Sequence, residues 1–478
     1  MRNYICKTGT GQPAKDFVFF DYMNLITKVK EHETLFSLLK LSGPIVLANI
    51  LQTAYQLIDT FWLGRIGAGA VAAVSLSFPL LFLIISLGIG LTLAGSILAS
   101  QYKGMDNQRM INYASAQTYF VMLFIGTLLA AAGYYFAEPL MRLVGAEGEI
   151  LRDSVDYFKV SSIGFIFLFL FFVFQSLMRG IGNVVIPTYV VLSTVFLNLF
   201  LDPLFIYGWG AFPAMGVAGA AMASVITQGL SALAGFIIIY RGKNGIQLSW
   251  KDFKFDFEFT KILVKLGVPA SMEMSTRALG MAVLMVLVTG FGGMVIASYG
   301  IGARILSFVI IPALGLSSAT TALVGQYVGA ERIKEAADVG RLSAKLAFFS
   351  LTLIGGLLFL VAEPLTAFFV PGEERVIHNG AMFIKVMAPS FGLLGVQQVI
   401  NGVFNGAGFT LASLLLSVLS LWIIRFPLAF ILSNQTSLSF EGIWWAFPVS
   451  NLIAAIAAII WFRTGSWKGK KRVGFNVK

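Results

Sequence analysis

The sequence contains about twelve long apolar stretches, and each can cross a lipid bilayer as a helix of roughly 20 residues. Charged residues make up only 12% of the chain and apolar residues 57%, whereas soluble domains carry roughly a quarter charged residues. The run GFIFLFLFFVF, which starts at Gly164, shows none of the two-residue alternation of barrel strands. The sequence therefore predicts an all-α polytopic membrane protein. Its predicted spans lie near 43–63, 71–98, 113–136, 158–178, 185–207, 216–240, 268–289, 295–322, 342–362, 382–403, 408–432 and 442–462.

Basic residues are distributed unevenly between the two sets of predicted loops. With the N-terminus inside, 25 Lys and Arg residues face the cytoplasm and at most six face outward. Because cytoplasmic loops carry the excess of positive charge, we expect both termini in the cytoplasm and the protein in the cell (inner) membrane. The formal charge of +11 then reflects loops that face anionic membrane lipid, and nucleic acid is not an expected partner. Residues 1–42 show no cleavable signal and predict a cytoplasmic arm, whereas 464–478 predict a basic cytoplasmic tail.

Short motifs recur at a nearly constant separation and reveal two related halves. Gln101-Tyr102 recurs as Gln326-Tyr327, 225 residues later, and further pairs such as Pro44 and Pro269 follow in order at 225 or 226. Each half holds six spans, an even number, so both halves enter the membrane from the same side as parallel repeats.

Two parallel six-span bundles with a central cleft are the architecture of a secondary transporter that works by alternating access. We expect one bundle at 43–240 and another at 267–463. The cytoplasmic linker at 241–266 is expected either to lie along the membrane surface or to be a solvated connector. The single cysteine, Cys6, excludes an internal disulfide. The sequence has no Walker-type phosphate loop and no nucleophile–histidine constellation, so neither direct use of ATP nor an enzyme is expected.

Three carboxylates fall inside predicted spans, where charge is rare and usually functional: Asp59, Asp202 and Glu273. The repeat places Leu284 opposite Asp59 and Phe426 opposite Asp202. An acid that the fold itself required would more naturally appear in both halves. The asymmetry therefore indicates an ion-coupling site in the first bundle.

The neighbours of these acids are polar and suitably spaced. Asn198 precedes Asp202 by four residues, and Tyr55 precedes Asp59 by four, so each pair shares one helix face, with Gln52 a further turn back. Carboxylate and amide oxygens suit a hard cation, so Asp59, Asn198 and Asp202 are candidate Na⁺ ligands. The two acids could equally share a proton, and the sequence leaves H⁺ and Na⁺ open. A helix–helix hydrogen bond without an ion is the simpler alternative.

In the second bundle, Glu273 is followed four residues later by Arg277, which predicts either an internal ion pair or a substrate-facing pair. Arg304 and Arg425 also lie within spans, and either could neutralise Glu273 or line the cleft. Met281 is one of several methionines that offer adaptable apolar surface to a substrate. Pro44, early in the first span, is a candidate hinge.

Several motifs are specific when they are taken together and in order: Pro44, Tyr55-Gln-Leu-Ile-Asp59, Gln101-Tyr102, Arg179-Gly180-Ile-Gly182-Asn183 and Asn198-Leu-Phe-Leu-Asp202-Pro203-Leu204. Through these motifs the chain resembles the multidrug and toxic compound extrusion (MATE) family of cation-coupled efflux transporters from about Leu35 to Thr464. The resemblance implies twelve helices in two bundles, no cofactor, and efflux of cationic amphipathic compounds driven by inward H⁺ or Na⁺. It also implies that Asp59, Asp202 and Asn198 form the coupling site, that Ser224 matches a hydroxyl of that site, and that the first helix bends near Pro44.

One departure separates this chain from part of the family. Another branch uses a carboxylate in the tenth helix, where this sequence has Gln397 and Gln398. The resemblance is therefore closer to the DinF-like branch. Glu273 matches an acid that recurs in the family's seventh helix, which leaves a role for the second bundle open.

Two other classes of protein compete with a multidrug antiporter. A lipid-linked precursor flippase would need cationic residues in its cleft, and Arg277, Arg304 and Arg425 are the candidates. A channel would not need two deep acids confined to one bundle. Expected partners of the antiporter are small organic cations and membrane lipids. Because twin bundles form their own cleft, we expect a functional monomer.

Overall fold

The computed structural model describes residues 15–209 and 212–469, with side chains described from residue 32 onward. Every regular element of this part is helical, and twelve segments are long and apolar enough to cross a membrane, which confirms the predicted number of spans. The first half contains α1 (Lys15–Ile66), α2 (Ala68–Gly104), α3 (Gln108–Tyr135), α4 (Ala137–Leu143), α5 (Gly148–Gly180), α6 (Val185–Tyr207) and α7 (Gly216–Tyr240). The linker contains η1 (Trp250–Asp252). The second half contains α8 (Phe257–Thr289), α9 (Gly293–Gly329), α10 (Ile333–Leu360), α11 (Ala362–Phe369), α12 (Glu374–Met387), η2 (Ala388–Ser390), α13 (Phe391–Gly406), α14 (Thr410–Val418), η3 (Leu419–Arg425), α15 (Phe426–Asn434) and α16 (Glu441–Thr464).

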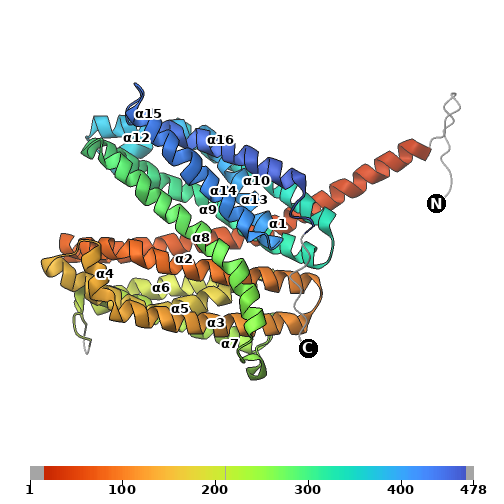
Figure 1. Cartoon of the computed structure of the whole chain (residues 1–478), viewed down its shortest axis with the longest axis horizontal. Helices are drawn as coiled ribbons and strands as arrows, with labels where there is room; N and C mark the ends of the chain where they lie inside the picture. The colour runs from red at the N-terminus through yellow and green to blue at the C-terminus, as the bar shows by residue number, and fades with distance from the viewer. Residues whose placement is uncertain (1–14, 210–211, 470–478) are drawn as a thin grey trace.

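The helix boundaries repeat with the separation that the sequence motifs predict. Both ends of α2 and of α3 recur 225 residues later, as the ends of α9 and of α10. Figure 1 shows the resulting pair of bundles, with α2 to α7 on one side and α9 to α16 on the other. The second half differs mainly in its interruptions, because η2 divides the tenth span and the π-helical turn η3 divides the eleventh.

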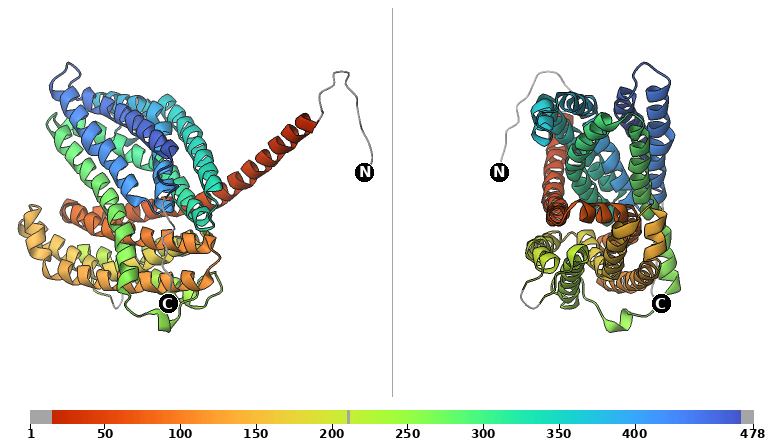
Figure 2. Two further views of the ribbon diagram at one scale, coloured as in Figure 1. Left: turned by 45° about the vertical axis from the view of Figure 1, so that its right-hand side comes forward. Right: turned by 90° about the vertical axis from the view of Figure 1, so that its left-hand side faces the viewer.

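Part of the first helix of each half packs into the core of the other half. Leu38 and Leu41 of α1 are buried with residues of the second bundle, and Leu263 and Leu266 of α8, 225 residues later, are buried with residues of the first. Both long helices then cross the junction between the bundles, as the two views in Figure 2 show. Bundles that start at residues 43 and 267 therefore leave out these leucines, which belong to the core of the opposite bundle.

Small residues allow these helices to cross closely. A Cβ atom on Gly315 of α9 would lie 2.4 Å from the side chain of Val46, and one on Gly90 of α2 would lie 2.1 Å from the backbone of Ser271. Val46 and Ser271 are repeat partners, as are Gly90 and Gly315. Pro44 thus lies one turn or less from the point where α1 contacts the second bundle.

The segment that precedes the first predicted span and the linker both contain regular structure. α1 starts at Lys15, ahead of the predicted span, and Figure 1 shows its N-terminal part projecting away from the bundles. Residues 1–14 and 470–478 lie outside the described part. The linker is docked on α3, where the side-chain amide of Gln117 donates hydrogen bonds to the carbonyls of Asp252 and Lys254 at 2.7 and 2.6 Å. The linker is therefore held against the first bundle and is not a free solvated connector.

Candidate functional site

Three helices of the first bundle bring the predicted coupling residues together. α1 supplies Tyr55 and Asp59, α6 supplies Asn198 and Asp202, and α7 supplies Ser224. Asn198 and Asp202 are completely buried, and Asp59 is half-buried. Their spacing of four residues places each pair on one helix face, and the packing of α6 against both α1 and α7 makes those faces meet.

Hydrogen bonds connect the side chains across the three helices. The hydroxyl of Tyr55 donates to Ser224 Oγ at 2.8 Å, and Ser224 Oγ donates to Asp59 Oδ2 at 3.4 Å. Within α6, Asn198 Nδ2 donates to Asp202 Oδ1 at 2.8 Å. The carboxyl groups of Asp59 and Asp202 lie near each other, where α1 packs against α6.

Three buried oxygen atoms at this place have no hydrogen-bond donor: Asp59 Oδ1, Asp202 Oδ2 and Asn198 Oδ1. A buried acceptor without a donor costs about 1–3 kcal/mol, and more when it is charged. In the part of the chain that the structure covers, neither acid forms an ion pair. A proton or a monovalent cation between these oxygens would remove the cost of the missing donors and the cost of the unpaired charge. The described residues contain no group of three or more His, Cys, Asp or Glu suited to a tightly bound metal.

The sequence analysis missed two members of this site. Thr227 lies one turn after Ser224 on α7, and its hydroxyl is 3.1 Å from that of Tyr55. Tyr157 of α5 lies near both acids. The three-residue spacing of Ser224 and Thr227 was a usable signal, because residues at i and i+3 share a helix face. Nothing in the local sequence marks Tyr157, which comes close only through the packing of α5.

The other residues predicted for the site or the hinge lie outside this buried network. Gln52 is exposed on α1 and Met281 is 58% exposed on α8, so neither belongs to the buried polar network of the first bundle. Pro44 lies inside the continuous helix α1, and its carbonyl accepts a hydrogen bond from Thr188 Oγ1 of α6 at 3.0 Å. The candidate hinge is therefore held by the bundle that carries the acids.

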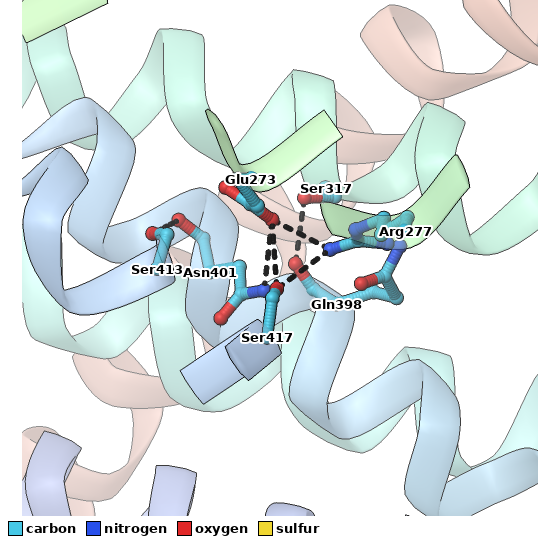
Figure 3. A network of polar contacts seen from close by, with 7 residues as sticks. All are labelled: Glu273, Arg277, Ser317, Gln398, Asn401, Ser413 and Ser417. Carbon is cyan, nitrogen blue, oxygen red and sulfur yellow. Dashed lines mark hydrogen bonds and ion pairs between the residues drawn. The ribbon is translucent and has the colours of Figure 1, made fainter. Parts of the chain in front are cut away.

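In the second bundle, Glu273 forms the ion pair that its spacing from Arg277 predicts. Arg277 Nη2 lies 2.6 Å from Glu273 Oε1, and Asn401 Nδ2 and Ser417 Oγ donate to the same oxygen at 3.2 and 3.3 Å (Figure 3). Glu273 is only 2% exposed. One oxygen of this carboxylate thus has a cation and two neutral donors, and the other, Oε2, has none; unlike the acids of the first bundle, Glu273 has a basic partner.

The two remaining membrane arginines do not contact Glu273. Arg304 is exposed on α9. Arg425 ends η3 and is buried, with its Nε donating to Ser450 Oγ at 2.8 Å and its Nη2 to Asn451 Oδ1 at 2.7 Å. Of the three arginines that the sequence offered as partners of Glu273, Arg277 takes that role.

Two parallel six-span repeats, with charged side chains buried inside each, define a secondary transporter of the membrane. Comparisons with known proteins specify the kind. The MatE family model matches residues 44–204 and 269–431, so the chain belongs to the MATE family of multidrug efflux transporters, whose members are transporters and not enzymes.

Relatives match along nearly the whole chain. The Probable multidrug resistance protein YpnP of Bacillus subtilis is 30% identical over 434 residues, covering 90% of this chain and 95% of its own length. YoeA of the same organism, also named a Probable multidrug resistance protein, is 28% identical and covers 90% and 93%. A solved structure of a multidrug resistance MATE family transporter in an outward-facing conformation has a TM-score of 0.85. It is 24% identical, covers 91% of this chain and 96% of its own, and shows the likeness of the fold.

Proposed function

We propose that this protein is an antiporter of the DinF-like branch that exports cationic amphipathic compounds in exchange for H⁺ or Na⁺ by alternating access. The observation that carries the proposal is the set of three buried oxygens without a donor, from Asp59, Asn198 and Asp202. Such a group is stable when it holds a proton or cation and unstable when it is empty. Its occupancy can therefore bias the conformation in which the site is closed.

Both candidate ions fit the donor set by different routes. A proton can be shared between the carboxyl groups of Asp59 and Asp202, with Tyr55 and Ser224 fixing the position of Asp59. Na⁺ would instead bind the oxygens of Asp59, Asn198 and Asp202 directly. The hydroxyl of Tyr55 is a positioning group in both routes, and the amide of Asn198 is a positioning group in the proton route and a ligand in the Na⁺ route.

The remaining site residues are assigned by their place in the transport cycle. Gln52, Glu273, Arg277 and Met281 are proposed to line the route of the organic substrate between the bundles. Pro44 is proposed as the hinge of α1, because its missing N–H leaves one backbone hydrogen bond of the helix unmade beside the contact with α9. We place the protein in the cell membrane as a monomer with both termini in the cytoplasm, since that orientation puts most loop cations inside.

The first experiment measures efflux of ethidium from cells that lack their own pumps. Wild type is compared with Asp202→Asn at matched expression, and Glu363→Gln serves as the control, because Glu363 is an exposed acid on α11. We expect wild type and the control to pump and Asp202→Asn to fail. Equal pumping by Asp202→Asn would contradict the coupling site, and failure of wild type would favour the flippase.

A second experiment identifies the coupling ion. Purified protein in proteoliposomes is given an H⁺ gradient or a Na⁺ gradient separately, and ethidium movement is followed. Only the coupling gradient should drive uptake in wild type, and Asn198→Ala should reduce transport more strongly if that gradient is Na⁺. Transport that follows neither gradient would contradict an antiporter and favour a channel.

A further inference from the structure

The second bundle contains a buried positive charge that no acid balances. Arg425 is 8% exposed, and its hydrogen bonds go to the neutral side chains of Ser450 and Asn451. Its guanidinium carbon also lies 4.5 Å from the centre of the Phe447 ring. No carboxylate within the described ranges forms an ion pair with it.

The neighbouring charges do not relieve this imbalance. Arg277 lies on α8, which packs against η3, so its positive charge acts on that of Arg425. The acid of the region, Glu273, is already paired with Arg277 at 2.6 Å (Figure 3). The three groups together therefore carry one net positive charge at membrane depth. A guanidinium cannot lose its proton in a protein, so Arg425 cannot remove this charge by itself.

The backbone at Arg425 is unusual as well. Residues Leu419–Arg425 form a π-helical turn, η3, and π turns inside helices occur frequently at functional sites. Arg277 adds a second feature, because its Nε is buried without an acceptor although its side chain is 21% exposed. Arg425 thus lacks a counter-ion, and Arg277 has one N–H donor without an acceptor.

The two bundles have opposite unmet charge. In the first, Asp59 and Asp202 are acids without a basic partner, and in the second Arg425 is a base without an acidic one. A residue that merely clamps η3 to α16 would not need a charge, since Gln could also donate to Ser450 or Asn451. The charge itself therefore calls for an anion.

We propose that Arg425, with Arg277 beside it, forms an anion-binding subsite that accepts the carboxylate of an amphipathic substrate. This inference rests on the proposed function, and it extends the substrate class to cationic amphipathic molecules that also carry a carboxylate. The carboxylate would accept hydrogen bonds from the guanidinium groups and balance the net charge of the cluster. The cationic part of the same molecule remains free for the acids of the first bundle.

The test compares two dyes that differ in a single group. Rhodamine 110 carries a free carboxylate, and rhodamine 123 is its methyl ester with the same cationic ring system. Binding of each dye to the purified full-length protein is measured by fluorescence anisotropy, and the ratio of the two Kd values is the readout. We expect Arg425→Gln to shift this ratio against rhodamine 110 by roughly tenfold, because a hydrogen bond to a charged group is lost. Arg425→Lys keeps the positive charge and should therefore shift the ratio of the two Kd values less than Arg425→Gln does.

Control variants separate a lost subsite from general damage. Arg304→Gln removes the same charge from an exposed span position and should leave the ratio unchanged. Asp202→Asn should stop coupled transport and also leave the ratio unchanged. If Arg425→Gln fails to fold, Glu273→Gln with Arg277→Gln removes the second guanidinium without leaving an unpaired acid, and the ratio should again shift against rhodamine 110.

Each remaining outcome has one meaning. An unchanged ratio in Arg425→Gln overturns the subsite. If Arg425→Gln does not fold, an unchanged ratio in the double variant Glu273→Gln with Arg277→Gln overturns it. A wild-type protein that binds rhodamine 123 but not rhodamine 110 also overturns the subsite and leaves the proposed function standing. A wild-type protein that binds neither dye contradicts the proposed function itself.

Discussion

The side-chain amide of Gln101, on α2 of the first bundle, donates a hydrogen bond to the carbonyl of Gly406 in the second bundle at 3.1 Å. Its repeat partner Gln326 on α9 donates to the carbonyl of Gly180 in the first bundle at 3.0 Å. The repeated Gln-Tyr motif therefore forms two reciprocal contacts between the bundles. Both lie at the C-terminal ends of α2 and α9, which the proposed topology places on the cytoplasmic side.

Replacing both glutamines should open this junction. Gln101→Leu with Gln326→Leu leaves two carbonyl acceptors without these donors, and each lost hydrogen bond is worth about 0.5–1.5 kcal/mol. Together they should shift the equilibrium between closed and open cytoplasmic ends by roughly tenfold or more. Distance distributions between spin labels on α3 and α10 would measure the change. An unaltered distribution would mean that the two contacts do not hold the junction closed.

Gly104 and Gly329, which lie two residues after the two Gln-Tyr motifs, should be harder to replace. A Cβ atom on Gly329 would lie 2.0 Å from the carbonyl oxygen of Gln101, and Gly104 faces the carbonyl of Gln326 in the same way. Gly104→Ala or Gly329→Ala must therefore push the bundles apart, and we expect a lower melting temperature and slower transport. Gly356→Ala in α10, where a Cβ atom meets nothing within 4 Å, is the matched control. Equal stability of all three variants would contradict this close approach.

The hydroxyl of Tyr55 should matter for ion coupling more than for folding. Tyr55→Phe removes the donor that positions Ser224 against Asp59, but it keeps the buried ring. We expect transport to fall several-fold and a higher ion concentration to be needed for half-maximal rate. Stability should change by only about 1 kcal/mol, because hydrogen bonds between membrane helices are modest in strength. Thr227→Val, which alters the same hydroxyl cluster, should have a weaker effect in the same direction.

The hinge role of Pro44 can be compared directly with that of its repeat partner. Pro44→Ala restores an N–H that can bond to the carbonyl four residues earlier, so α1 becomes stiffer. If α1 must bend during transport, Pro44→Ala should slow efflux more than Pro269→Ala does. Thr188→Val, which removes the hydrogen bond to the Pro44 carbonyl, should alter the rate as well. Equal rates for the two proline variants would argue for a static kink at both positions.

The proposed orientation can be tested with single cysteines, because Cys6 is the only native cysteine. In a Cys6→Ser background, Lys334→Cys should be protected from an impermeant thiol reagent in intact cells. Glu373→Cys should be labelled by the same reagent. Both positions are exposed, so a difference in labelling reports the side of the membrane. The reverse labelling pattern would mean that the membrane orientation is opposite to the one proposed.

Much of the architecture could be predicted from the sequence because it depends on local composition and on repetition. Span number follows from the length of apolar runs, and the repeat of α2 and α3 as α9 and α10 follows from motifs such as that of Gln101 and Gln326. The pairing of Glu273 with Arg277 was one of two open alternatives, and it follows from a spacing of four residues on one helix.

Contacts between distant segments were decided only by the tertiary structure. Part of each bundle's first helix packs into the core of the other bundle, as Leu38 and Leu263 show, and no local pattern encodes which core covers an apolar residue. Tyr157 reaches the acids only through α5, and Asn401 reaches Glu273 across 128 residues of sequence. The sequence by itself determined which side chains had to avoid lipid. The packing of the helices determined which of these side chains would meet. Any polar partner stabilises a polar group that is buried in a membrane, and only the geometry of the fold decides which partner is within reach.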